Sequence, residues 1–288
     1  MFTFVAAPAA RGKVSPYPRY GGVNSVKCTK VAVCAGRGFC ATIGTDGRVA
    51  GRRPAPGMGA LTGERRHLMR LPNILLLYTD QWRWDALGVN GNADVQTPNL
   101  DRLAGEGTTF DHYFVQNPVC MPSRVSFLTG QYPSTLRITH MGVPVPEATV
   151  TLPKLLRPYG YTSANIGKLH FLPHANRDHR EPHPSYGFDH LEIADEPGCY
   201  DDAYRAWVRR KAPDQLDLIS LGLPPASETW RQALGINDTV RHPTERFPLA
   251  ALPFRGRSDV THSAFVAEQT LAFIDQQGDR PFFCIAGF

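Results

Sequence analysis

Four side chains in this sequence have the types and spacing needed to act on an anionic ester. Cys120 could supply a nucleophile, and Arg124 lies four residues later, about one helical turn further on. Lys168 and His170 alternate with Leu169, so in an extended segment their side chains point the same way. We therefore expect two cations and one imidazole around a reacting centre, with the imidazole at the leaving or nucleophilic oxygen.

A carboxylate at the end of an apolar run could add a metal ion to this set. Asp80 follows the run of residues 73–79, which is typical of a buried strand in a parallel sheet. In open α/β sheets ligands bind beyond the carboxyl ends of the strands, so Asp80 stands where chemistry is usually placed. Its hard oxygen atoms suit calcium or magnesium.

Each of these residues also has an ordinary structural interpretation. Cys120 could be a small, partly buried apolar residue, and Asp80 could only cap a helix. Lys168 could be a solvated surface lysine, and His170 a hydrogen-bonded loop histidine. The residue types alone leave both interpretations open.

The neighbouring residues favour the chemical interpretation, because several segments resemble the sulfatase family in the right order. Cys120 to Arg124 reads C-M-P-S-R, which is similar to the family's C-x-P-S-R motif, and Leu-Thr-Gly follows at 128–130. Further matches are the metal-binding Asp turn at 73–88, the first helix at 97–104 with Gly107, the G-Y-x-T element at 160–162, and the G-K-x-H element at 167–170.

The resemblance implies a sulfuric ester hydrolase of the formylglycine-dependent type within the alkaline phosphatase superfamily. Cys120 would be oxidised after translation to formylglycine by a maturation enzyme, and its hydrated aldehyde would attack sulfur and release the alcohol. The other hydroxyl would then lose its proton and sulfate would be expelled. Arg124, Lys168 and His170 would be the other catalytic residues. The metal ligands would be Asp80, Gln81 and residue 120, holding Ca²⁺ or else Mg²⁺ or Mn²⁺.

Two features depart from the family pattern or exceed it. Many members carry a second acid directly after the first metal-binding Asp, whereas this sequence has Gln81, which offers only a neutral carbonyl oxygen. His174, His179, His183 and His190 could suggest a second metal cluster, but they lack helical i, i+4 spacing. We expect a substrate-facing or solvated loop there.

The elements that must position these residues alternate between helix and strand. We predict strands at 73–79, 108–114, 162–166 and from 281 onward, and helices at 98–103, 123–128, 151–158, 201–211 and 260–277. Residues 174–184 and 221–254 are predicted to be long loops. The alternation indicates an α/β fold with a mostly parallel central sheet flanked by helices, alkaline-phosphatase-like in view of the resemblance.

The family's later metal ligands and its smaller C-terminal domain would follow the strand that begins near Pro281. Because the sequence ends at Phe288, we expect residues 69–288 to be the N-terminal part of a catalytic domain, truncated before its C-terminal part. We also expect little activity from these 288 residues alone.

Charge divides the chain into two unlike parts. The net charge of +5 combines +10 in residues 1–70 with −5 in the remainder. Residues 1–68 are rich in Gly, Pro and Arg and lack any helical or strand period, so we expect a poorly structured basic leader. That leader could be an organelle transit peptide, or translated upstream sequence with Met69 as the true start.

Composition narrows the other classes of function. The basic leader could bind nucleic acid, but it lacks interleaved aromatic residues, and we expect no nucleic-acid partner. We expect no membrane partner either, because the longest apolar runs are far shorter than roughly 20 residues. A phosphonate monoester or phosphodiester hydrolase of the same superfamily is the alternative function, although Lys168 and His170 favour sulfate.

Localisation and assembly are only weakly constrained. Six cysteines in a chain of this length do not make a disulfide-dense scaffold, and no secretory signal is evident, so we expect a cytoplasmic protein. Periplasmic and organellar locations stay open, as does the oligomeric state. The expected substrate is a small-molecule or saccharide sulfate ester.

Overall fold

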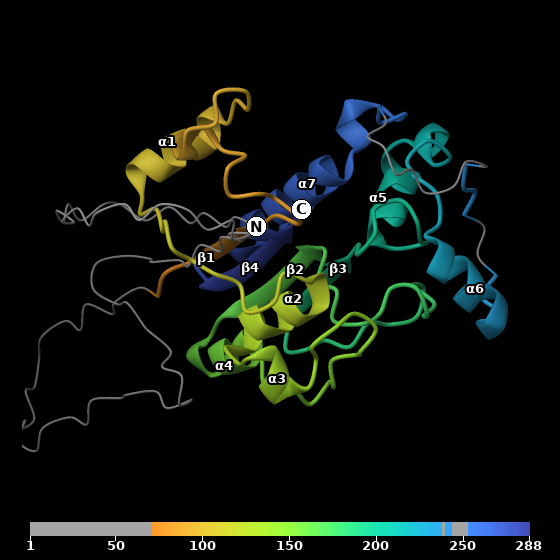
Figure 1. Ribbon diagram of the computed structural model, residues 1–288, viewed down its shortest axis with the longest axis horizontal. Coiled ribbons are helices and arrows are strands. Elements are labelled where there is room, and N and C mark those ends of the chain that lie inside the picture. Colours follow the sequence, from red (N-terminus) through yellow and green to blue (C-terminus); the bar gives the residue numbers. More distant parts are fainter. Residues whose placement is uncertain (1–70, 238–239, 244–252) are drawn as a thin grey trace, which may run out of the picture.

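A four-stranded parallel sheet forms the centre of the protein, as the sequence predicts. The computed structural model describes residues 71–237, 240–243 and 253–288. The strands are β1 (Ile74–Tyr78), β2 (Thr162–Gly167), β3 (His190–Ile193) and β4 (Phe282–Gly287). They pair in the order β1-β4-β2-β3, and every pair is parallel (Figure 1).

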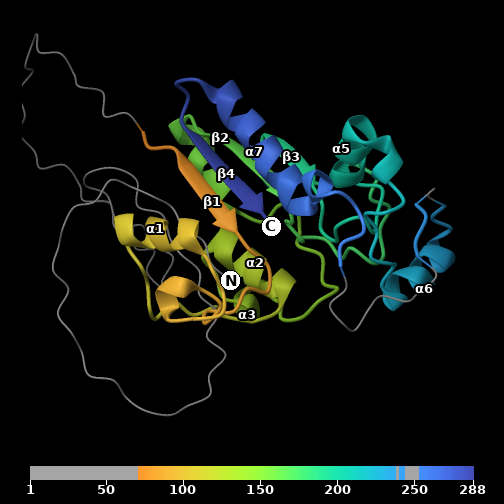
Figure 2. The ribbon, with the colours of Figure 1, turned by 90° about the horizontal axis from the view of Figure 1, so that it is seen from above.

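Helices cover both faces of this sheet, so its strands are apolar on both sides. On one face lie α2 (Cys120–Thr129), α3 (Pro133–Leu136) and α4 (Leu152–Leu156), and on the other lie α5 (Ala203–Lys211) and α7 (His262–Gln277). Figure 2 shows α2 and α3 on one side of the sheet and α7 on the other. Alternate residues of β4 enter the two cores: Phe283 and Ile285 pack on the α2 side, whereas Phe282, Cys284 and Ala286 pack on the α7 side. This two-sided burial explains the unbroken apolar runs of β1 and β4.

Local signals set the helix ends. Asp202 accepts a hydrogen bond from the Arg205 backbone N–H at the start of α5, and Thr261 accepts one from Ala264 at the start of α7. Gly130, in the left-handed conformation, ends α2. The remaining elements are α1 (Pro98–Glu106), α6 (Pro225–Leu234) and the short 3₁₀ helices Gly88–Asn90, Arg157–Tyr159, Pro213–Gln215 and Ser258–Val260.

The five predicted helices and three of the predicted strands are confirmed, but two other predictions are wrong and one strand was not predicted. Residues 108–114 form no strand, and Phe114 is 52% exposed, so this segment lies outside the sheet. The loop predicted at 221–254 contains α6, whose Pro225 stands in the first turn, where the missing N–H costs nothing. The short strand β3 was not predicted, because only four residues with a polar His190 and Glu192 carry too little pattern.

The carboxyl ends of the four strands meet at one edge of the sheet, where β2 and β4 approach very closely. Gly167 has a φ of 91°, and a Cβ on it would stand 2.0 Å from the carbonyl oxygen of Gly287. A Cβ on Gly287 would in turn meet the backbone of Lys168. Only glycines fit this contact, and it determines where the chain leaves β2 toward Lys168.

The basic leader predicted at residues 1–68 lies outside the described residues. No helix within the described ranges is long and apolar enough to cross a membrane.

Candidate active site

An ionic cluster at the carboxyl edge of the sheet joins Asp80, Arg124 and Lys168. Asp80 follows β1, and its Oδ1 accepts a hydrogen bond from Arg124 Nη2 at 3.0 Å while its Oδ2 lies 3.2 Å from Lys168 Nζ. Burial alone would raise the pKa of Asp80, but the charges of Arg124 and Lys168 outweigh it and lower the pKa below its usual value. The carboxylate is therefore ionised and bound by two cations.

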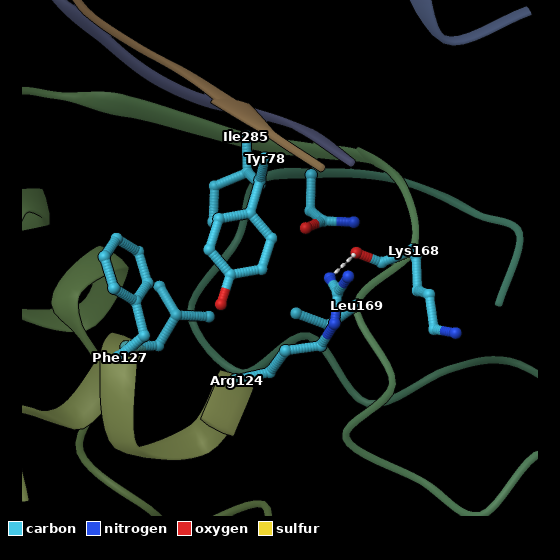
Figure 3. Close-up of a pocket in the computed structure, with 8 residues that line it drawn as sticks. Tyr78, Arg124, Phe127, Lys168, Leu169 and Ile285 are labelled. Atoms are coloured by element: carbon cyan, nitrogen blue, oxygen red, sulfur yellow. Dashed lines mark hydrogen bonds between the residues drawn. The ribbon is translucent and has the colours of Figure 1, made fainter. Parts of the chain in front are cut away.

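Arg124 is the structural centre of this cluster. Its side chain is 3% exposed, its Nη1 donates to the Lys168 carbonyl oxygen at 2.7 Å, and its guanidinium carbon lies 4.7 Å from the centre of the Tyr78 ring. Figure 3 shows Arg124 extending from α2 toward this carbonyl, beside Tyr78, with the Lys168 ammonium directed away from the pocket. One guanidinium thus ties α2 to the segments that follow β1 and β2.

Cys120 begins α2 and faces the same cluster. Val119 before it is extended, so the helix starts at Cys120 and Arg124 follows one turn later on the same side. The Cys120 Sγ lies 4.0 Å from Asp80 Oδ2 and is partly exposed. Burial raises the pKa of the thiol despite the opposing charge of Lys168, so the unmodified residue is a neutral thiol at neutral pH.

Lys168 and His170 lie in a tight turn after β2. Burial would lower the pKa of Lys168, but the carboxylates of Glu196 and Asp80 more than compensate and raise it, so its ammonium stays charged. The predicted extended segment is wrong at His170, where φ is 53°. The His170 ring is fully buried, and neither of its nitrogens has a hydrogen-bond partner within the described residues. Burial lowers the pKa of His170 to about 3, so this imidazole is neutral.

Two carboxylates that follow β3 were not predicted at this site. Glu196 Oε1 lies 3.3 Å from Lys168 Nζ, and the buried Asp195 accepts backbone hydrogen bonds from the Lys168–His170 turn. The sequence signal for Asp195 and Glu196 is that they follow the end of a strand by two and three residues. The sequence analysis does not predict β3, so it does not place these carboxylates at the site.

The histidine-rich loop packs beside the cluster. His174 Nε2 lies 3.6 Å from Glu196 Oε1, and its Nδ1 is 2.9 Å from the Tyr200 hydroxyl. His179 stacks on the Tyr200 ring at 3.9 Å. Burial lowers the pKa values of His174, His179 and His183, so the prediction of a solvated loop fails for these three rings but holds at Arg180 and Glu181, which are exposed. A substrate-facing role stays a prediction.

The donor atoms near Cys120 match part of what a hard divalent cation requires. Asp80 offers a partly exposed carboxylate, and Gln81, which is exposed with a φ of 48°, follows it at the turn. Within the described ranges, no group of three or more His, Cys, Asp or Glu side chains is arranged to hold a metal. Since Ca²⁺ takes about six to eight oxygen ligands, these residues fit a cation but supply only part of its shell.

Comparison with known protein families shows to which family the chain belongs. The family model described as sulfatase matches residues 72–288, which includes every element described above. The chain belongs to the sulfatase family. The resemblance carried by the C-M-P-S-R segment is thereby confirmed, and so is the alkaline-phosphatase-like α/β fold.

Individual sulfatases match over part of their length. The chain is 36% identical to human N-acetylgalactosamine-6-sulfatase over 164 residues, which cover 52% of this chain and 30% of that protein. It is 32% identical to an arylsulfatase of Clostridium perfringens over 212 residues, which cover 68% of this chain and 42% of that protein. The chain thus spans well under half the length of these relatives.

A solved structure shares the same architecture. The phosphonate monoester hydrolase of Agrobacterium radiobacter superposes with a TM-score of 0.56 and 26% sequence identity, covering 76% of this chain and 40% of that chain. The sulfatase fold of this chain is therefore shared with a hydrolase whose name denotes a phosphonate substrate.

Proposed function

We propose that the protein hydrolyses a sulfate monoester, with residue 120 as the position of the nucleophile. The observation that carries this proposal is the convergence of Cys120, Asp80, Arg124 and Lys168 at one strand edge in a member of the sulfatase family. A sulfate ester is anionic and poorly electrophilic. It needs a strong nucleophile together with positive charge on its oxygens, and this cluster has the residues to provide both.

The cations have separate tasks in this proposal. Lys168 stays charged and its ammonium lies between two carboxylates, so it can bind a sulfate oxygen by exchanging one of these partners for the substrate. Arg124 is almost completely buried, and its Nη groups are already used by Asp80 and the Lys168 carbonyl. It therefore orients residue 120 and Asp80 rather than moving to the substrate.

His170 can exchange protons with the reacting oxygens. Its imidazole is neutral at neutral pH, so one ring nitrogen can accept a proton while the other donates its N–H. Both ring nitrogens are buried without a hydrogen-bond partner within the described residues. Burying them in this way costs free energy unless a ligand forms hydrogen bonds with them. A sulfate ester would supply the missing oxygen acceptor.

We propose that Cys120 is matured to formylglycine, whose hydrated aldehyde supplies the hydroxyl that attacks sulfur. Asp80, Gln81 and residue 120 would hold a divalent cation, most simply Ca²⁺, which would add positive charge at the sulfate oxygens. Binding of the cation by Asp80 would relieve the ion pair between Asp80 and Lys168 and leave the ammonium to the substrate.

The substrate class in this proposal is a sulfated saccharide. Two relatives carry names that point to such substrates, N-acetylgalactosamine-6-sulfatase and the ulvan-active sulfatase of Formosa agariphila, the latter 37% identical over 119 residues. The phosphonate monoester hydrolase fold makes a phosphonate ester the competing substrate.

The test uses the protein produced together with a formylglycine-generating enzyme. We expect the peptide containing residue 120 to have the mass of formylglycine, and kcat/KM for an aryl sulfate to exceed that for an aryl phosphonate monoester by at least about 100-fold. Cys120→Ala should abolish turnover. Cys284→Ala, which removes a buried thiol from β4, should leave turnover unchanged. A preference for the phosphonate would overturn the proposal.

A further inference from the structure

Asp195 is the buried carboxylate beneath the Lys168–His170 turn. It comes two residues after β3, whose Ile193 pairs with Gly167 at the end of β2, so the strand register brings it alongside the turn. Its Oδ1 accepts the backbone N–H of Leu169 at 3.1 Å and that of His170 at 2.8 Å. Its side chain is completely buried.

The turn needs this acceptor because its shape is unfavourable for the residues it contains. His170 has a φ of 53°, a left-handed conformation that is unfavourable for a residue with a Cβ. Two adjacent N–H groups donate to one carboxylate oxygen and compensate for that cost, since hydrogen bonds to a charged group are stronger than those between neutral groups.

Other parts of the turn are fixed by different elements. The Lys168 N–H donates to the Gly287 carbonyl at 3.1 Å, and the Lys168 carbonyl accepts from Arg124. The Phe171 carbonyl accepts from the Val145 N–H at 2.9 Å. The N–H groups of Leu169 and His170 both donate to Asp195, which alone among these partners holds the backbone between the two proposed catalytic side chains.

Asp195 is held in its charged form. Burial would raise its pKa, but His170 and Arg177 lower it well below the usual value, and Arg177 Nη2 lies 3.3 Å from its Oδ2. Since His170 is neutral above about pH 3, Arg177 is the lasting counter-charge. Asp195 Oδ1 therefore accepts the hydrogen bonds of the turn, and Oδ2 faces Arg177.

We propose that Asp195 is a positioning residue of the sulfatase reaction, which sets the directions of Lys168 and His170 by holding the backbone between them. The proposal rests on the proposed function, because it assigns Asp195 the geometry of two residues of that site. Asp195 touches neither residue 120 nor Asp80 in this arrangement, so its effect passes through the turn.

The chain contains a matched control at the other end of the same strand. Asp189 precedes β3 and accepts the backbone N–H of Ser163, at the start of β2, at 2.8 Å. Its second oxygen accepts from Arg157 at 2.7 Å. Asp189 thus makes the same kinds of contact as Asp195, but at the amino end of the sheet and away from the cluster.

The experiment compares Asp195→Ala and Asp195→Asn with Asp189→Ala and Asp189→Asn in the full-length matured protein. We expect Asp195→Ala to lower kcat for an aryl sulfate by about 10- to 100-fold, because small misplacements of catalytic groups have effects of this size. Asp195→Asn keeps an acceptor oxygen and should retain an intermediate kcat. Both Asp189 variants should stay within about twofold of the unaltered protein.

Amide hydrogen exchange gives a second measurement that does not depend on turnover. Asp195→Ala should speed exchange in the peptide covering residues 167–171, whereas Asp189→Ala should speed it only near Ser163. If the Asp195→Ala protein does not fold, the Asn variants carry the same comparison. Equal kcat values for the Asp195 and Asp189 variants would overturn the positioning role.

The two proposals fail in different ways. If the unaltered protein turns over no sulfate ester, the proposed function is wrong, and exchange at residues 167–171 still decides whether Asp195 holds the turn. If the unaltered protein is active and Asp195→Ala is equally active and equally protected, only the positioning role is wrong.

Discussion

At the scale of single residues, the site depends on a buried guanidinium with three simultaneous contacts. Arg124 binds Asp80 Oδ1, the Lys168 carbonyl and the Tyr78 ring. A lysine has one compact ammonium in place of the planar fork, so it cannot make these contacts together. A lysine at position 124 would keep the positive charge but lose the arrangement of these three contacts.

We therefore predict that Arg124→Lys lowers the free energy of unfolding by about 1–3 kcal/mol, because it leaves a buried acceptor unsatisfied. Chemical denaturation of the folded variants measures this. Arg157→Lys is the control, since Arg157 also binds a carbonyl and a carboxylate, those of Gly187 and Asp189, but is 56% exposed. Arg157→Lys should lower the free energy of unfolding by less, and a decrease as large as that of Arg124→Lys would contradict the prediction.

At the scale of elements, the site depends on how closely β2 and β4 end together. Gly167 combines a φ of 91° with a Cβ position 2.0 Å from the Gly287 carbonyl, so alanine there would be strained and would also clash with backbone. The clash cannot be relieved by rotating a side chain. The chain must move, and Lys168 would move with it.

Gly142 separates these two effects. It has a φ of 89°, but no atom lies within 4 Å of its added Cβ. Gly142→Ala should cost only the left-handed strain, about 1–2 kcal/mol, whereas Gly167→Ala should cost a further 1–3 kcal/mol or so from overpacking. Thermal and chemical denaturation check the difference, and equal costs would show that β2 and β4 can separate without penalty.

The elements also show what sequence reasoning could and could not reach. The strand before Asp80, the strand β2 and the helix that carries the C-M-P-S-R segment were predictable, because periodicity and end signals are local. Residues 108–114 have strand-like composition but form no strand, since a strand also needs a neighbouring backbone. Asp195 and Glu196 reach the site only through the pairing of β3 with β2, a contact that no local pattern encodes.

At the scale of the whole molecule, buried neutral histidines couple the fold to pH. Burial lowers the pKa of His170 to about 3 and those of His179 and His262 to about 4. The unfolded chain takes up these protons near pH 6.5, well before the folded chain does. Acid therefore favours the unfolded state, and the stabilisation present above pH 6.5 is lost as the pH falls toward 4.

The prediction is a steep loss of stability between pH 6.5 and 4, to which each histidine contributes on the order of 3 kcal/mol at most. His262 tests it on the α7 side of the sheet, where its ring packs edge-on against Tyr204. His262→Phe should flatten the dependence of the unfolding free energy on pH. Tyr204→Phe, which removes a hydroxyl that donates to the Val260 carbonyl, should lower stability equally across this range. A pH dependence that His262→Phe leaves unchanged would mean that this imidazole takes up its proton at the same pH in the folded and the unfolded protein, and that acid acts on the fold through other groups.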